Sequence, residues 1–455
     1  MNELPFKRLA ARIGELQAHK HSGQVAAVTA GVVAVSGLAR VGAVGDRVAI
    51  NPTDRPPIHA EVLRLEADHV TVLPEGDLDG VTLGAPVTYL GRAEVFPALA
   101  WVGQVIDAFG QPLDGTPLPK GGKAYPLRPP APNAMARRGL GARLDTGVAA
   151  IDTFLPLVRG QRMGLFAGSG IGKPTLLAGL ARGVNADLTV IALIGERGRE
   201  VREFVENVLG SEGMKRAIVV AATSDQHALV KRRAAWMAMT IAEYFRDIGA
   251  QVVFLADSVT RFADAHREIA LQSGEPAVLR GYPPSTAKLV MDLCERAGPG
   301  QDGQGDISAI FSVLVAGSDM EEPIADLMRG VLDGHIILSR EIAERGRFPA
   351  IDVLKSVSRS LPGAATEDEN ALLQDARGRL MRYEDAKLMV QAGLYTSGND
   401  PDLDKALQSF AGLDNFFRGV GVGAANESFN ALSAALGRRP IRSPAIDLAN
   451  LTTDA

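Results

Sequence analysis

The stretch that decides the fold runs from residue 163 to residue 181 and reads MGLFAGSGIGKPTLLAGLA. Its first residues are apolar, as in a buried strand, and helix-forming residues follow position 175. Between them lies a glycine-rich turn that ends in Gly172-Lys173. Glycines let backbone N–H groups curl around phosphate oxygens, and the helix adds its positive end, so this pattern predicts a phosphate-binding loop. The predicted nucleotide-binding residues are Gly168, Ser169, Gly170, Ile171, Gly172, Lys173, Pro174 and Thr175.

Position 174 departs from the pattern of such loops. The residue after Gly-Lys is normally Ser or Thr, whose hydroxyl binds Mg²⁺, whereas this chain has Pro174. Proline is sterically acceptable in the first turn of a helix, but it removes both a hydroxyl and a backbone N–H. Thr175 lies about 100° further round the helix and is the candidate substitute as metal ligand. The substitution puts metal affinity and turnover in question, but not the fold.

The region from about Leu140 to Leu361 alternates apolar runs with helical stretches, which indicates a mostly parallel sheet covered on both faces. Most of the apolar runs end in a polar or glycine cluster. Ligands of open α/β sheets bind beyond the carboxyl ends of the strands, so the chemistry is expected at these clusters. The expected strands are Met163–Ala167, Leu188–Ile194, Ala217–Ala221, Val252–Ala256, Ile307–Val315 and Ile336–Leu338.

Two carboxylates follow predicted strands next to the phosphate loop. Asp257 ends the apolar run that begins at Val252, and an Asp in that place can hold the shell of a Mg²⁺ ion. Glu196 follows the strand Leu188–Ile194, where a carboxylate can orient a water molecule toward the γ-phosphate. The alternatives are a helix-capping Asp257 and a solvated charged loop around Glu196.

The rest of the chain predicts three further parts. Leu4, Leu9, Ile13 and Leu16 recur at helical spacing, which predicts an amphipathic helix over residues 1–20. Short apolar runs separated by Gly and Pro predict a β-barrel or sandwich over residues 21–96. The α/β domain is assigned to residues 97–365, with a Pro- and Gly-rich surface connector at 110–132. Residues 366–455 are expected to form a helical domain with an irregular end after Arg438.

The composition excludes several classes of protein. Apolar residues make up 46% and charged residues 22% of 455 residues, so the chain is globular and not disordered. The net charge of −5 argues against nucleic-acid binding through bulk charge. The single cysteine, Cys294, excludes an intrachain disulfide and fits a reducing compartment. The longest uncharged run, residues 22–39, contains three glycines and reads as strands, so the chain is expected to be a soluble cytoplasmic protein.

Several further motifs resemble the flagellar protein-export ATPases, which belong to a wider group with the rotary F- and V-type ATPases and the injectisome ATPases. The resemblance rests on the phosphate loop and on residues 195–201 (GERGREV), 257–262 (DSVTRF), 280–285 (RGYPPS), 339–346 (SREIAERG) and 356–359 (SVSR). It implies a β-barrel, a RecA-like P-loop nucleotide domain and a C-terminal helical domain. It also implies a ring of six subunits with ATP at the subunit interfaces.

The resemblance assigns roles to individual residues. It implies that Lys173 contacts phosphate, that Glu196 is the catalytic carboxylate and that Arg197 supports it. Asp257 is implied to be the acid associated with Mg²⁺, which accompanies ATP as cofactor. Arg359 is implied to be an arginine finger that acts on the neighbouring subunit. Phe348 falls where the rotary ATPases keep an aromatic ring against the adenine.

The resemblance also implies partners and a location. A regulatory stator-type protein is expected at the N-terminal helix, with export substrates, their chaperones and a membrane export gate as further partners, and no nucleic acid. The protein is expected in the cytoplasm, peripherally bound to the inner face of the membrane. Two alternatives stay open: an injectisome ATPase, and a weakly or non-catalytic ring subunit, which Pro174 favours. Glu196 favours catalysis, because non-catalytic rotary subunits carry Gln there. A hexameric RNA helicase is disfavoured by the acidic balance.

Overall fold

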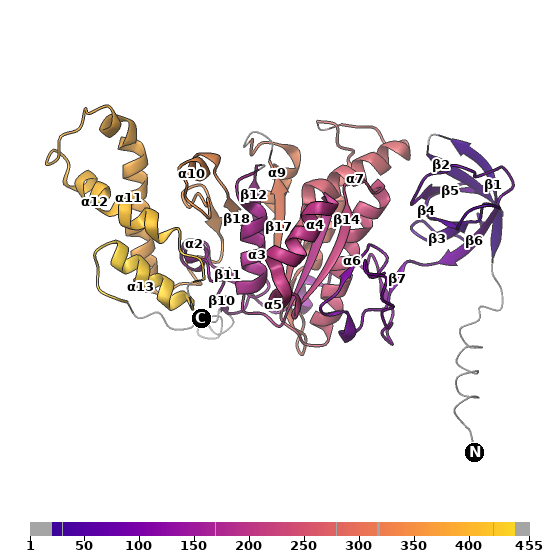
Figure 1. Cartoon of the computed structure of the whole chain (residues 1–455), viewed down its shortest axis with the longest axis horizontal. Coiled ribbons are helices and arrows are strands. Elements are labelled where there is room, and N and C mark those ends of the chain that lie inside the picture. The colour runs from indigo at the N-terminus through magenta and orange to yellow at the C-terminus, as the bar shows by residue number, and fades with distance from the viewer. Residues whose placement is uncertain are drawn as a thin grey trace, which may run out of the picture. The chain divides into compact units, whose positions relative to one another are not determined.

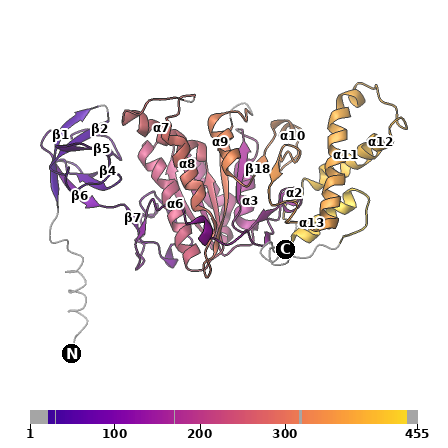
Figure 2. The ribbon, with the colours of Figure 1, turned by 180° about the vertical axis from the view of Figure 1, so that it is seen from behind.

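The computed structural model describes residues 21–441 except Ala30, Ser169, Leu279, residues 316–318 and Val422. The helix predicted at residues 1–20 and most of the segment after Arg438 lie outside the described residues. The chain divides into two compact units, of which the smaller comprises the residues up to Glu94 together with Glu268–Pro276. Figure 1 and Figure 2 show the chain from opposite sides.

The smaller unit contains a closed antiparallel barrel with the strand order β1-β2-β5-β4-β3-β6, in which β6 pairs back to β1 (Figure 1). Alternate side chains point inward, and Val33, Val35, Val70 and Val72 are fully buried. Because closure pairs every strand on both sides, the fold is a barrel and not a sandwich with open edges. Its strands are β1 (Ser22–Thr29), β2 (Val32–Ser36), β3 (Arg47–Ile50), β4 (Ile58–Leu65), β5 (His69–Pro74) and β6 (Pro86–Gly91).

The larger unit is built on a sheet with the order β19-β18-β12-β17-β15-β13-β14-β8. All six strands predicted for this region are present, and they pair in parallel. The short strands β8 (Val105–Ile106), β16 (Gly298–Pro299) and β19 (Val357–Ser358) were not predicted, because two residues carry too little pattern. The six predicted strands are β12 (Arg162–Ala167), β13 (Leu188–Glu196), β14 (Ala217–Thr223), β15 (Val252–Asp257), β17 (Asp306–Leu314) and β18 (Gly334–Ile337).

Helices cover both faces of this sheet, which explains why its strands are apolar throughout. Helices α3 and α4 lie in front of the strands in Figure 1, and α6 and α8 lie in front of them in Figure 2. The helices of this region are α3 (Lys173–Gly183), α4 (Gly198–Glu203), the π-helical η3 (Phe204–Leu209), α5 (Gly210–Met214), α6 (Ala228–Asp247), α7 (Val259–Gln272), α8 (Ser285–Arg296), α9 (Pro323–Val331) and α10 (Arg340–Glu344).

The segment from Glu94 to Val158 contains only short elements. The expected surface connector packs on the helices α6 and α8, because the carbonyl oxygen of Leu127 accepts hydrogen bonds from Thr240 and Arg296 at 3.2 and 3.0 Å. Leu127 itself is buried. The elements are β7 (Glu94–Val95), η1 (Leu99–Trp101), β9 (Tyr125–Pro126), η2 (Ala134–Ala136), β10 (Arg143–Leu144), α2 (Ala149–Phe154) and β11 (Leu157–Val158).

The C-terminal part is helical, as predicted, with α11 (Glu367–Gln391), α12 (Pro401–Phe416) and α13 (Ala425–Ala435). Thr366 and Glu369 form a capping box at the start of α11, which satisfies N–H groups that have no partner within the helix. The carboxylate of Glu369, buried within the fold, also pairs with Arg143 at 3.2 Å. Leu372, Leu413 and Phe429 join the core of the α/β region. The boundaries expected at residues 96 and 365 stay predictions.

None of the described helices combines the length and apolar character needed to cross a lipid bilayer.

Candidate nucleotide site

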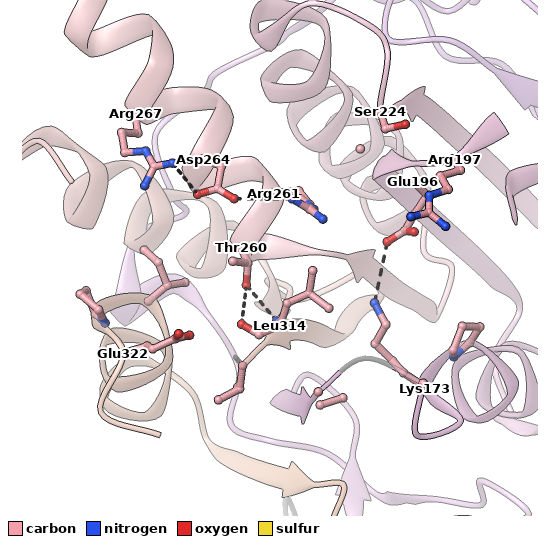
Figure 3. Close-up of a pocket in the computed structure, with 18 of the residues that line it drawn as sticks. Lys173, Glu196, Arg197, Ser224, Thr260, Arg261, Asp264, Arg267, Leu314 and Glu322 are labelled. Carbon is pink, nitrogen blue, oxygen red and sulfur yellow. Dashed lines mark hydrogen bonds and ion pairs between the residues drawn. The ribbon is translucent and has the colours of Figure 1, made fainter. Parts of the chain in front are cut away.

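A pocket of about 830 Å³ lies at the carboxyl ends of the central strands (Figure 3). The loop after β12 forms one wall, and the end of β13 and the first turns of α7 form another. The loops that precede α8 and α9 close the remaining side. Segments that are far apart in the chain therefore meet where the sequence predicts phosphate chemistry.

The phosphate loop leads directly from β12 into α3. Gly170 and Gly172 have φ angles of +77° and +85°, which side chains other than glycine rarely adopt. Gly172 is the N-cap of α3, so the first N–H groups of this helix point into the loop. Lys173 begins the helix, and only 7% of its surface is exposed. The geometry is that of an anion-binding turn at a helix N-terminus.

Lys173 meets the two predicted carboxylates. Its Nζ contacts Oδ1 of Asp257 directly and lies 3.9 Å from Oε1 of Glu196. Figure 3 shows Lys173 and Glu196 pointing toward one another across the pocket. The hydroxyl of Ser312 on β17 donates a hydrogen bond of 2.6 Å to Asp257. One buried ammonium and two carboxylates thus face a common space at the ends of β12, β13 and β15.

Glu196 is set up to change its charge near neutral pH. Burial raises its pKa to about 7, the negative charge of Asp257 adds to the rise, and Lys173 opposes it. A carboxylate that positions water must be ionised to accept the water's hydrogen bond. The raised pKa therefore places the change of charge of Glu196 close to neutral pH.

We expect kcat/KM for ATP hydrolysis to rise as pH increases through about 7, because kcat/KM reports the ionisation of the free protein. Steady-state rates between pH 5.5 and 8.5 at constant ionic strength measure this. ATP binding to Glu196→Gln over the same series corrects for protonation of ATP itself. A corrected profile that is flat across this range contradicts the assignment.

Pro174, where the usual metal-binding hydroxyl is missing, and Thr175, the candidate substitute, differ in their surroundings. Pro174 lines the pocket. Thr175 is exposed and does not belong to the pocket lining. No group of three His, Cys, Asp or Glu residues that would hold a metal occurs among the described residues. Mg²⁺ normally uses one or two carboxylates, water and substrate phosphates, so the carboxylate of Asp257 beside the phosphate loop fits this ion.

Phe348 lies beside the phosphate loop. A Cβ atom at Gly172 would be 3.3 Å from Cδ1 of Phe348, so the ring packs next to the start of α3. Half of the surface of Phe348 is exposed, which leaves part of its ring free to contact a ligand. The structure therefore brings the predicted aromatic residue to the phosphate loop, although 175 positions separate Phe348 from Lys173.

Arg197 and Arg359 lie differently. Arg197 lines the pocket, but its side chain is 73% exposed and pairs with Glu200 at 3.4 Å. Arg359 is exposed and follows β19, where Ser358 pairs with Gly334 at the amino end of β18. In the sheet, Gly334 is level with Met163 of β12. Met163 precedes Gly168 of the phosphate loop by five residues, which corresponds to roughly 16 Å along the strand. Arg359 therefore lies at the opposite end of the sheet from its own phosphate loop.

Some residues in or beside the pocket had no role in the sequence analysis. Ser312 interrupts a buried apolar strand, and this is the signal that marks it. Arg261 packs against Gly195, where a Cβ atom would meet its side chain at 3.4 Å, and Figure 3 shows it extending toward Glu196. Asp264 accepts a hydrogen bond of 2.8 Å from the hydroxyl of Tyr282. Arg261 and Tyr282 belong to the motifs at residues 257–262 and 280–285, but the neighbours of these three residues come from other segments, so no individual role could be assigned to them from the sequence.

Comparisons with known proteins agree with this geometry. Residues 147–358 match the nucleotide-binding domain of the ATP synthase alpha/beta family, and residues 365–419 match the T3SS EscN ATPase C-terminal domain. The chain is 48% identical to the flagellum-specific ATP synthase of Caulobacter vibrioides over 402 residues, which cover 87% of this chain and 90% of that protein.

Two solved structures are also similar. The assembled ATPase EscN of the enteropathogenic E. coli type III secretion system superposes with a TM-score of 0.85 and 35% identity, over 91% of this chain and 100% of that one. EscN in complex with its central stalk EscO gives a TM-score of 0.84 with the same identity and coverage.

Proposed function

Because the chain belongs to the family of flagellum-specific ATP synthases and type III secretion ATPases, we propose that it hydrolyses ATP to drive protein export by a flagellar export apparatus. The observation that carries this proposal is the meeting of Lys173 with Asp257 and Glu196 at the phosphate loop. A buried ammonium faces the place of the phosphates, and two carboxylates face the place of the attacking water and the metal ion. These are the groups that phosphoryl transfer to water requires.

Each side chain has a separate task in this proposal. Lys173 binds the β- and γ-phosphates and offsets their charge. Glu196, when ionised, accepts a hydrogen bond from a water molecule and aims it at the γ-phosphorus. Arg197 supports Glu196 from the rim, and Phe348 stacks on the adenine. Positioning and charge stabilisation supply most of the catalysis, because phosphoryl transfer needs little covalent help from the protein.

We assign Mg²⁺ to the part of the pocket beside Lys173, whose Nζ contacts the buried Asp257. The donors that would hold it are Asp257, held in place by Ser312, the phosphates and water. Thr175 is the remaining hydroxyl near the loop, but it is exposed and outside the pocket lining. Bound Mg²⁺ neutralises charge on the β- and γ-phosphates. Pro174 removes the usual protein hydroxyl, and this supports reduced turnover as part of the proposal.

We expect Pro174→Ser to raise Mg²⁺-dependent turnover about tenfold. Serine restores both the hydroxyl and the N–H of the loop, and a hydrogen bond to a charged group contributes roughly 1.5–3 kcal/mol, where ~1.4 kcal/mol corresponds to tenfold. Steady-state ATP hydrolysis over a Mg²⁺ titration measures the change.

Two further variants separate the causes of this gain. Pro174→Ala returns the N–H without the hydroxyl, so it is expected to recover only a part of the gain. Thr175→Ala tests whether the neighbouring hydroxyl already serves the metal. Equal metal affinity and turnover in wild type and Pro174→Ser would show that the loop has adapted to proline.

We propose that the active form is a homohexameric ring in which Arg359 completes the site of the next subunit. The exposure of Arg359 and its distance from its own phosphate loop support action in trans. The assembled state of the similar protein EscN supports a ring.

We propose further that residues 1–20 bind a regulatory stator-type partner. Export substrates, their chaperones and a membrane export gate are the other partners in this proposal, and they place the working protein at the inner face of the membrane. The EscN–EscO complex supports a stalk partner of the same general kind.

Two alternatives are separable by experiment. An injectisome ATPase shares every feature of the site, whereas a non-catalytic ring subunit binds ATP without turnover, as Pro174 would favour. A steady-state ATPase assay with purified wild type, with and without Mg²⁺, tests catalysis. Expression in a strain that lacks its flagellar export ATPase, with export of flagellin as the readout, tests the flagellar assignment. ATP binding without measurable hydrolysis would support the non-catalytic alternative.

A further inference from the structure

A buried arginine fixes the loop that carries Phe348. Arg347 has only 8% of its surface exposed. Its Nη2 donates a hydrogen bond of 2.8 Å to the carbonyl oxygen of Ile351, and its Nη1 lies 3.4 Å from Oδ1 of Asp414 on α12. Its guanidinium also lies over the ring of Phe417, 5.0 Å from the centre. The planar group thus joins loop and helix, which a flexible lysine would do less well.

A second arginine makes the same connection from the helix side. Nη1 of Arg418 donates a hydrogen bond of 2.7 Å to the carbonyl oxygen of Gly346, and Nη2 lies 3.3 Å from Oδ2 of Asp414. Asp414 therefore pairs with both arginines, one from the loop and one from the end of α12. The two residues before Phe348, Gly346 and Arg347, are thus tied to the C-terminal helices, and Arg347 also holds Ile351 within the loop.

The other side of Phe348 faces the nucleotide site. Its ring lies beside Gly172, the residue before Lys173, and half of its surface is exposed. In both Figure 1 and Figure 2, α10 and the loop that follows it lie between α3 and the C-terminal helices. A continuous set of contacts thus runs from Asp414 through Arg347 and Phe348 to the phosphate loop.

We propose that Arg347 is a positioning residue: it holds Phe348 in place as the platform for the base of ATP, and so makes base affinity depend on the C-terminal helices. This inference rests on the proposed function, in which Phe348 stacks on the adenine. Coupling of this kind is reciprocal, so bound ATP stabilises the contact between α12 and the loop by the same factor.

The test compares two ligands that differ in the base. ATP presents phosphates and a base, whereas inorganic tripolyphosphate presents phosphates alone. We expect Arg347→Ala and Phe348→Ala each to weaken ATP binding on the order of tenfold, the scale of one lost base–aromatic stack. Tripolyphosphate binding is expected to stay within about twofold of wild type, because Lys173 and the loop glycines are untouched. Calorimetric titration of the purified full-length chain measures both affinities.

The double variant decides whether Arg347 acts through Phe348. If it does, Arg347→Ala adds almost nothing to the loss of ATP affinity in Phe348→Ala, so the two effects are not additive. Arg347→Lys is expected to bind ATP with intermediate affinity. If Arg347→Ala does not fold, Arg347→Lys with and without Phe348→Ala completes the same cycle.

Arg377→Ala is the matched control. Arg377 also joins α11 to the α/β region, through a hydrogen bond of 3.2 Å to the carbonyl oxygen of Phe154 and a position over that ring, but it does not contact the loop 346–351. Its removal is expected to lower thermal stability without changing the ratio of ATP to tripolyphosphate affinity.

Four results would overturn the inference. Additive effects of Arg347→Ala and Phe348→Ala, or equal weakening of ATP and tripolyphosphate, would show a general structural role for Arg347. If the wild-type protein binds tripolyphosphate as tightly as ATP, the role of Phe348 as a platform for the base is refuted, whereas the assignment of the phosphate site is not affected. Wild type that binds neither ligand would overturn the proposed function, and this inference with it.

Discussion

Glu196→Gln is expected to lower ATP turnover by on the order of 10²-fold or more, the usual scale for loss of a general base, while ATP still binds. Glutamine keeps the size of the side chain, but its neutral amide lacks the negative charge that orients the attacking water. The phosphate contacts of Lys173 and the loop remain, because Glu196 lies 3.9 Å from Lys173 and Asp257 is the direct partner. Removal of the carboxylate also removes the pH dependence near 7 that its raised pKa causes.

Single-turnover hydrolysis and equilibrium binding of ATP, measured on the same preparation, separate the two effects. Glu203→Gln is the matched control. It makes the same substitution at a glutamate on α4 that is exposed and does not line the pocket. It is expected to hydrolyse ATP at the wild-type rate. Hydrolysis by Glu196→Gln at that rate would refute the role of this carboxylate.

Arg359→Ala is expected to lower turnover by on the order of 10²-fold or more, within the range known for arginine fingers. The backbone at Arg359 lies at the amino end of β18, roughly 16 Å along the strands from the level of its own phosphate loop, and its Nη2 donates a hydrogen bond of 3.4 Å to the carbonyl oxygen of Arg329. From this position, we expect Arg359 to stabilise charge on the γ-phosphate of the neighbouring subunit and not of its own. The loss should therefore depend on assembly, unlike the loss in Glu196→Gln.

Mixed rings test this dependence directly. Arg359→Ala supplies Glu196, and Glu196→Gln supplies Arg359, so an equal mixture restores up to about a quarter of the interfaces if subunits mix at random. Activity is expected to peak near equal proportions. The control replaces Glu196→Gln by the Glu196→Gln/Arg359→Ala double variant, which has no finger to contribute. An absence of rescue at every ratio would exclude action in trans.

Much of the architecture was predictable because it depends on short continuous patterns. The glycine-rich turn between strand and helix identifies a phosphate loop wherever it occurs, since its backbone geometry is local. The six central strands are mostly apolar because helices cover both faces of the sheet, and their bounds agree with the structure to within a few residues. Asp257 and Glu196 were found because each ends such a strand.

The arrangement of these pieces depended on the tertiary structure. Strands follow one another along the chain as β12, β13, β14, β15, β17 and β18, whereas in space β12 lies between β18 and β17. Hydrophobic periodicity reports whether a strand is buried but not which strand it pairs with. The bond from Ser312 to Asp257 follows from the pairing of β15 with β17, and it could not be read before that pairing was known.

By itself, the sequence predicted a nucleotide-binding loop on an α/β domain, because the residues that predict it are contiguous from Gly168 to Thr175. It also showed that Pro174 stands where a Ser or Thr normally supplies the metal-binding hydroxyl, because this difference concerns a single position of the motif. Only the tertiary structure brought Phe348 to Gly172, joined Arg347 to Asp414 on α12, and set Arg359 at the far end of the sheet. The reason is physical: these contacts join segments far apart in the chain, and their geometry depends on how the helices and strands pack, which no local pattern records.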